Sequence, residues 1–435
     1  MRMWRAVLFG LLIAALATIG NVPFDPLRAV AQSEPVWTSG TQVQNLGSAP
    51  ANVKLTYYEP DGSVAATQTV VIQPGLSYTF YGETMAVRPG FRGSIVIEAD
   101  QPIASITNQI ASNPTMADAY AGIVAPATTA FLPLVMRDHQ GWTTEIFVQN
   151  GGAAAANAVK LDFYRGKDLV LSETLPAIAP GASYTLRQGA QDRLGATFVG
   201  SVKITADQPV ASVVNQTNGR ILMSYAGFTS GGSRVYAPLI MNNNRGWSTG
   251  LQVMNVGATE ATVTLRVGGR AADSAAIGPG QSKTWYPIPG TAAGFVGSAV
   301  VEGSPGAQLV GIVNEIHPEA GQGMTYTAFN TGSSRISAPL IMNDNRGWST
   351  GLQVMNVGAQ DASVTLKVDG QPAATAVIPA GQSQTWYPVP GTSPGFVGSA
   401  TAEGPSGTQL VGIVNELKTR DVDGDLAMAY VTFSQ

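Results

Sequence analysis

The chain has 435 residues, with 24 Lys and Arg against 28 Asp and Glu and a net charge of −4. This balance leaves no basic surplus for phosphate groups, so the composition argues against nucleic acid as a partner. Charged residues make up 12% of the chain, about half the usual fraction, and there is no cysteine. We therefore expect a neutral, hydrogen-bonding surface and domains held by their hydrophobic cores without disulfides.

The first 31 residues are typical of a secretory signal peptide. Two arginines precede an apolar stretch from Val7 to Gly20, and Ala29-Val30-Ala31 has the small side chains that a signal peptidase needs. We expect cleavage after Ala31 and a secreted, extracellular chain that begins at Gln32. The long segment between Gly20 and Ala31 leaves an uncleaved N-terminal anchor as the alternative. The apolar stretch is too short for a comfortable membrane span, and none is expected in the mature chain.

Internal repetition is the strongest signal in the rest of the chain. Each unit contains a Trp, an Asn that closes a strand-like run, a Pro-Gly or Ala-Gly turn, a Gly-Ser pair and a final aromatic strand. The tryptophans of the four units are Trp37, Trp142, Trp247 and Trp348. The sequence therefore predicts four domains, at residues 32–127, 128–231, 232–333 and 334–435.

Within each unit the residue pattern predicts β-strands. Ala261 to Val267 alternates small or polar residues with apolar ones, which is typical of a strand with one buried face. Gly268-Gly269 follows as a hairpin signal. About seven such strands in roughly 100 residues, separated by Gly, Pro and Asn, indicate an immunoglobulin-like or fibronectin-like sandwich. The expected fold is all-β, with four tandem sandwiches.

The frame of Trp-x-Thr, Val-x-Asn-x-Gly, Pro-Gly-x-Ser and Phe-x-Gly-Ser resembles the tandem immunoglobulin-like repeats of secreted and surface-layer-type proteins from bacteria such as the Chloroflexota. The resemblance covers Trp37 to Gln435. It implies an extracellular array of β-sandwiches. Its motifs are turn and core positions, so it assigns no functional residue.

One motif points to catalysis. Gly246-Trp247-Ser248-Thr249-Gly250, repeated around Ser349, matches the Gly-x-Ser-x-Gly turn of serine hydrolases. That turn needs a following helix and a histidine partner, but a strand follows here and the chain has 2 histidines. We expect no enzyme activity, and we expect both serines to be replaceable.

Aromatic pairs are the best candidates for ligand binding. Trp285-Tyr286 and Trp386-Tyr387 occur in the third and fourth units, and one residue of each pair should point outward. An exposed aromatic ring can stack on a sugar. The single tryptophan of each unit has two interpretations, a sugar platform or a plug at the rim of the core, and its recurrence favours the plug.

A loop in the fourth unit has the spacing of a calcium site. Asp421, Asp423 and Asp425 resemble the start of a Ca2+ loop, although the closing bidentate acid is missing. A solvated hairpin turn is the favoured interpretation. No other cofactor is expected.

These patterns favour a non-catalytic structural or assembly protein of the cell surface, whose partners are other envelope proteins or copies of itself. A glycan-binding or host-binding adhesin and an accessory module of an extracellular complex are the alternatives. Short linkers at Thr229 to Arg234 and Thr331 to Arg335 predict an elongated rod. The three later units begin with an apolar strand about six residues ahead of their Trp, whereas the first unit has only Gln32 to Val36 there after cleavage. We therefore expect an open sheet edge in the first unit, where another chain could add a strand.

Overall fold

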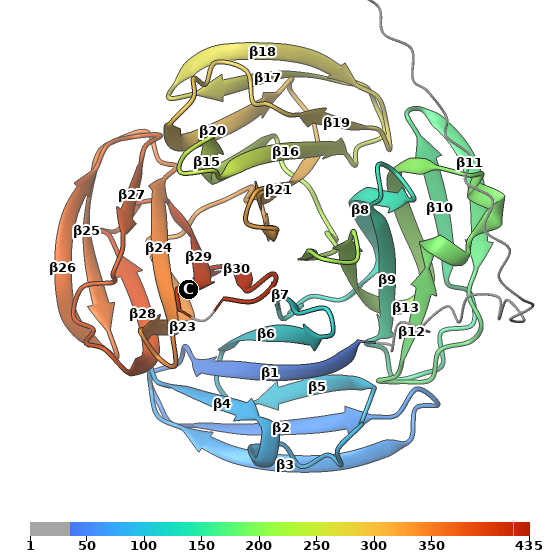
Figure 1. The fold of residues 1–435 in the computed structure, drawn as a ribbon, viewed down its shortest axis with the longest axis horizontal. Helices are drawn as coiled ribbons and strands as arrows, with labels where there is room; N and C mark the ends of the chain where they lie inside the picture. The colour runs from blue at the N-terminus through green and yellow to red at the C-terminus, as the bar shows by residue number, and fades with distance from the viewer. Residues whose placement is uncertain (1–34, 421) are drawn as a thin grey trace, which may run out of the picture. The chain divides into compact units, whose positions relative to one another are not determined.

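The computed structural model describes residues 35–420 and 422–435. These residues form strands and loops, with three short 3-10 helices, which confirms the all-β prediction. The predicted cleavage site after Ala31 lies outside the described residues. The strands fall into four groups that follow the sequence repeats, and we call them repeats 1 to 4 (Figure 1).

The elements of repeats 1 and 2 follow in chain order. Repeat 1 contains β1 (Val36–Asn45), β2 (Ala51–Tyr58), β3 (Val64–Ile72), β4 (Ser77–Tyr81), η1 (Gly82–Thr84), β5 (Ser94–Ala99), β6 (Ile103–Ser112) and β7 (Met116–Ala121). Repeat 2 contains β8 (Ala127–Arg137), β9 (Thr143–Asn150), β10 (Lys160–Arg165), β11 (Asp168–Thr174), β12 (Ser183–Arg187), η2 (Gln188–Ala190), η3 (Asp192–Leu194), β13 (Phe198–Thr217) and β14 (Leu222–Ala226).

Repeats 3 and 4 have almost the same elements as each other. Repeat 3 contains β15 (Arg234–Asn242), β16 (Ser248–Asn255), β17 (Ala261–Val267), β18 (Arg270–Ile277), β19 (Ser282–Trp285), β20 (Phe295–Gly303), β21 (Leu309–His317) and β22 (Gln322–Thr327). Repeat 4 contains β23 (Arg335–Asn343), β24 (Trp348–Asn356), β25 (Ala362–Val368), β26 (Gln371–Ile378), β27 (Ser383–Trp386), β28 (Phe396–Glu403), β29 (Leu410–Lys418), β30 (Ala427–Val431) and β31 (Phe433–Ser434).

Each repeat packs two antiparallel sheets face to face. In repeat 3 the strand orders are β15-β20-β17-β18 and β19-β16-β21-β22, and we call the second the inner sheet. Repeat 1 has the inner sheet β4-β1-β6-β7 and an outer sheet β3-β2-β5. In repeat 2 the 20-residue strand β13 runs through both sheets and joins them. The predicted alternation is confirmed in β17, where Ala261, Val263 and Leu265 are buried between the sheets.

The recurring asparagine fixes the corner after the first inner strand. Asn255 is fully buried, and its Nδ2 donates to the carbonyls of Thr259 (2.7 Å) and Ile277 (2.8 Å). Its Oδ1 accepts the Gly257 N–H at 2.9 Å. The same bonds form around Asn45, Asn150 and Asn356. This residue therefore recurs because it satisfies backbone groups that the turn would leave unpaired.

The repeats contact one another in a closed cycle, so the predicted rod was wrong for the described residues. At every junction a serine of one repeat donates to a glycine carbonyl of the next, and the fourth repeat donates to the first. These bonds are Ser94 to Gly181 (2.5 Å), Ser201 to Gly280 (2.5 Å), Ser298 to Gly381 (3.0 Å) and Ser399 to Gly75 (2.9 Å). The short linkers correctly predicted that repeats consecutive in the sequence are neighbours, but they carry no information on the contact between repeats 4 and 1.

Candidate functional site

The last inner strands of the four repeats, β7, β14, β22 and β30, pack against one another. Two buried aspartates connect them. Asp118 in β7 accepts the N–H groups of Ala429 (3.1 Å) and Ser224, which belong to repeats 4 and 2. Asp425 accepts those of Leu222 (2.9 Å) and Gly323 (3.0 Å), from repeats 2 and 3. Each aspartate therefore binds backbone segments that lie far apart in the sequence.

A second set of polar side chains, each buried or half-buried, runs through all four repeats. An Asn followed by Gln or Glu occupies the same two positions of β6, β13, β21 and β29, and the second residue pairs with the Asn of the next repeat. The pairs are Gln109–Asn215 (3.3 and 3.4 Å), Gln216–Asn314 (3.2 and 3.4 Å), Glu315–Asn415 (2.9 Å) and Glu416–Asn108 (2.9 Å). We call this closed cycle the amide ring.

Two members of the amide ring are acids in an apolar setting. Glu315 and Glu416 are fully buried, and desolvation by burial raises the pKa of each to about 8. Oε1 of Glu315 and Oδ1 of Asn415 are both buried acceptors without a partner among the described residues, as are Oε1 of Glu416 and Oδ1 of Asn108. A protonated carboxyl group supplies the missing donor, so each acid can then pair with its Asn as the glutamines do.

A cavity of about 130 Å³ lies between repeats 1 and 4, beside one of these acids. Its wall is apolar and aromatic, with Tyr81 from repeat 1 and Trp348 and Met428 from repeat 4. Thr38, Asn108 and Glu416 supply polar groups. An aromatic wall with a few convergent polar groups is typical of a site for a small neutral ligand.

The two predicted aromatic pairs are each split between core and surface. Trp285 and Trp386 are buried, and the Trp285 Nε1 donates to Asp273 at 2.7 Å. Tyr286 and Tyr387 point outward, with exposed fractions of 59% and 54%. Of the four predicted ligand-binding residues, these two tyrosines present a ring to solvent.

Tyr81 of repeat 1 occupies the same position and is 51% exposed. Each of the three tyrosines lies beside a glycine of the neighbouring strand, Gly40, Gly250 or Gly351, where a larger side chain would meet the ring. Repeat 2 differs, because Arg187 and Glu145 take these places and form an ion pair at 2.7 Å. The exposed rings therefore form a set of three that the pairwise motif alone did not reveal.

The tryptophan that marks each unit lies at the rim of the core. Trp142, Trp247 and Trp348 are partly buried and pack against the cores of their repeats. Trp37 is 42% exposed. The packing of Trp142, Trp247 and Trp348 agrees with the plug interpretation.

The serines of the Gly-x-Ser-x-Gly motif hold turns. Ser248 Oγ accepts the Asn243 N–H at 3.0 Å, and Ser349 Oγ accepts that of Asp344 at 3.0 Å. His317 packs edge-on against Trp247, and its Nδ1 accepts the Ala320 N–H. Both serines begin or lie in strands instead of the strand-to-helix turn that a hydrolase needs.

The predicted calcium loop is described only in part. Asp421 lies outside the described residues, and Asp423 is exposed. Asp425 is buried, and its oxygens accept backbone N–H groups as described above. Within residues 35–420 and 422–435, no three His, Asp or Glu side chains come together as metal ligands.

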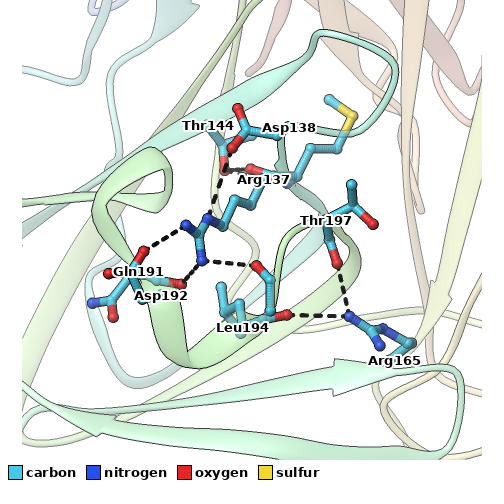
Figure 2. Close-up of polar contacts among 10 residues, drawn as sticks. Arg137, Asp138, Thr144, Arg165, Gln191, Asp192, Leu194 and Thr197 are labelled. Carbon is cyan, nitrogen blue, oxygen red and sulfur yellow. Dashed lines mark hydrogen bonds and ion pairs between the residues drawn. The ribbon is translucent and has the colours of Figure 1, made fainter.

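Repeat 2 holds one further polar cluster, shown in Figure 2. The buried Arg137 donates to Asp192 (2.7 Å) and to the carbonyls of Gly195 (2.8 Å) and Gln191. Arg165 donates to the Thr197 carbonyl at 2.9 Å. These bonds fix the loop that carries η2 and η3, where repeats 3 and 4 use Asn242 and Asn343 to hold a shorter loop. The cluster therefore has a structural role.

Sequence reasoning missed the amide ring and Asp118. A signal was present, because each recurring Asn is followed by Gln or Glu in the middle of an apolar strand. Polar pairs at such positions indicate a buried hydrogen-bond network.

A comparison with models of known protein families found no match, and a comparison with curated protein sequences found none either. Among the described residues, no helix has the length and apolar character to span a membrane.

Proposed function

We propose that this protein is a non-catalytic structural component of a bacterial cell surface, secreted and in contact with other envelope proteins or copies of itself. The cyclic contact of the four repeats supports this proposal. The buried acids bind the repeats to one another through hydrogen bonds with backbone N–H groups and asparagine amides. A low charge density suits close packing against other neutral surfaces.

Location and assembly of the full chain test this proposal together. We expect the protein in the envelope fraction of the cells that make it, and we expect electron microscopy of the purified chain to show filaments or sheets. Recovery from the cytoplasm, or separate particles at all concentrations, would contradict a structural role at the surface. Labelling of Ser248 or Ser349 by a fluorophosphonate would contradict the absence of catalysis.

Glycan binding is the second candidate function, and the three equivalent tyrosines favour it. Tyr81, Tyr286 and Tyr387 are each more than half exposed on separate repeats of one closed cycle. Several weak sugar contacts on one rigid body combine into stronger binding. The cavity beside Tyr81 and Trp348 adds a place where a sugar ring could be enclosed.

Replacing all three tyrosines with alanine should abolish retention on cell-wall polysaccharide and leave the thermal midpoint nearly unchanged. The matched control replaces Val199, Val296 and Val397, three equivalent exposed apolar residues, with alanine. Equal retention of both variants would exclude the tyrosines as a glycan site.

A further inference from the structure

Two residues that line the cavity between repeats 1 and 4 each have a buried oxygen atom with no hydrogen-bond partner among the described residues. These atoms are Oε1 of Glu416 and Oδ1 of Asn108. Glu416 is fully buried, and the other atoms of the two groups bond to each other, since Asn108 Nδ2 donates to Glu416 Oε2 at 2.9 Å. The buried part of the cavity wall therefore presents two adjacent acceptors.

The hydrogen-bond donors of the same wall are already bonded to protein acceptors. Their bonds run from Gln42 Nε2 to the Pro339 carbonyl (3.1 Å), from the Thr79 hydroxyl to Gln42 Oε1, and from the Thr38 hydroxyl to the Ile110 carbonyl (3.4 Å). The side chain of Ser39 lies on the other face of β1, because successive strand residues point to opposite sides. A ligand that enters the cavity therefore meets acceptors in place of donors.

This pattern selects the polar group of the ligand. A hydroxyl group brings one donor together with lone pairs that need donors, whereas an ammonium group brings three donors and no acceptor. A positive charge is also favoured, because Glu416 has no basic partner in the part of the chain that the structure describes. The aromatic wall accepts a neutral ring as well as a cation, so the two acceptors decide between them.

We propose that this cavity binds a small organic ammonium ion, with its nitrogen at Glu416 and Asn108 and its hydrocarbon part against Trp348 and Met428. An apolar cavity of ~150 Å³ holds a benzene ring. The volume of about 130 Å³ therefore suits a ligand of that size. The ammonium group takes the place of the carboxyl proton as the donor between the two oxygens.

Binding of the cation then displaces a proton from Glu416. Burial raises the pKa of this acid to about 8, so the affinity should rise about tenfold per pH unit up to that value. The other titratable groups around it are Tyr430, Tyr81 across the cavity, and Lys418 on the same face of β29. Tyrosine and lysine side chains ordinarily titrate near pH ~10, so a slope between pH 6 and 8 reports the acid.

Titration calorimetry of the full chain with benzylammonium chloride tests the proposal. Benzyl alcohol is the matched neutral probe, because it has the same ring and a hydroxyl in place of the ammonium. We expect benzylammonium to bind at least ~10-fold more tightly than benzyl alcohol at pH 8.

The variant Glu416→Gln places an amide N–H against the ligand nitrogen and should weaken benzylammonium binding at least ~10-fold. The matched control Glu315→Gln makes the same change in a Glu–Asn pair that does not line the cavity, and it should bind as the wild type does. Unchanged circular dichroism of both variants reports that they are folded.

Equal affinity for the two probes would assign the cavity to a neutral ligand and overturn the proposal. Equal affinity of the wild type and Glu416→Gln for benzylammonium would also overturn it, as would the absence of binding heat at millimolar concentrations. Retention on cell-wall polysaccharide is a separate measurement that Glu416→Gln should leave unchanged. Glycan binding by the exposed tyrosines therefore stands or falls independently of this cavity.

Discussion

Repeats 1 and 2 build their part of the amide ring from neutral amides, whereas repeats 3 and 4 use carboxyl groups at the same positions. Gln109 and Gln216 form reciprocal pairs with the next Asn, while Glu315 and Glu416 each receive one hydrogen bond and leave one oxygen unpaired. The geometry is the same, so the difference is one of protons. Each member of the amide ring must therefore supply both a donor and an acceptor. A carboxylate has acceptors only, whereas a carboxylic acid has both.

Asp118 accepts hydrogen bonds from backbone N–H groups instead of pairing with an amide. Burial raises its pKa, as it does for Glu315 and Glu416, and substitution of Asp118 gives the largest expected effect. Its oxygens accept N–H groups from Ala119 (2.8 Å), Ala429 (3.1 Å) and Ser224, so this site requires an acceptor on both sides. In Asp118→Asn an NH₂ group must face a backbone N–H. We expect a loss of about 3 kcal/mol in the free energy of unfolding, measured by urea denaturation. An unchanged denaturation midpoint would show that the contact between β7, β14 and β30 does not depend on this carboxylate.

Stability should fall as the pH rises, because of Glu315 and Glu416. Burial raises the pKa of both from 4.5 to about 8, so the folded chain binds more protons than the unfolded chain between these values. Below pH 4.5 both acids are protonated in the folded and in the unfolded chain, so they cost no stability. The free energy of unfolding falls as the pH rises from 4.5 to about 8, and it is constant above that value. Asp425, whose pKa is raised by burial to about 8, acts in the same direction.

The double variant Glu315→Gln with Glu416→Gln removes the titrating groups of the ring. It should be about 2 kcal/mol more stable than the wild type at pH 9 and nearly equal to it at pH 5. Urea denaturation at the two pH values measures both differences. A variant that is less stable at pH 9 would mean that the carboxylates are charged and paired with an unseen donor.

The reverse substitution gives the smallest expected effect. Gln109→Glu converts an amide junction of repeat 1 into the junction found in repeats 3 and 4. Its stability should match the wild type at pH 5 and fall by about 1 kcal/mol at pH 9, because one half-buried carboxyl group must then ionise or stay protonated above its usual range. The thermal midpoint at each pH provides the comparison, and a loss that is equal at both pH values would indicate a steric cause.

Local pattern alone determined the sandwich of each repeat. Strand alternation, as in Ala261 to Val267, and the hairpin at Gly268-Gly269 depend on neighbours within a few residues, so the sequence predicts them directly. The same holds for the recurring Asn255, whose bonds reach Thr259 and Ile277. The sequence also indicated that one residue of each aromatic pair faces solvent, but only the packing of the two sheets decided that it is Tyr286 and not Trp285.

Contacts between repeats were decided by tertiary structure. The bond from Ser399 to Gly75 joins residues separated by 324 positions, and Glu416 reaches Asn108 across 308. No strand period or turn residue records such a separation, so the sequence pattern of four similar modules did not distinguish the predicted rod from a closed cycle. The raised pKa values of Glu315 and Glu416 follow from these contacts, because both acids are buried beside Asn partners that belong to another repeat.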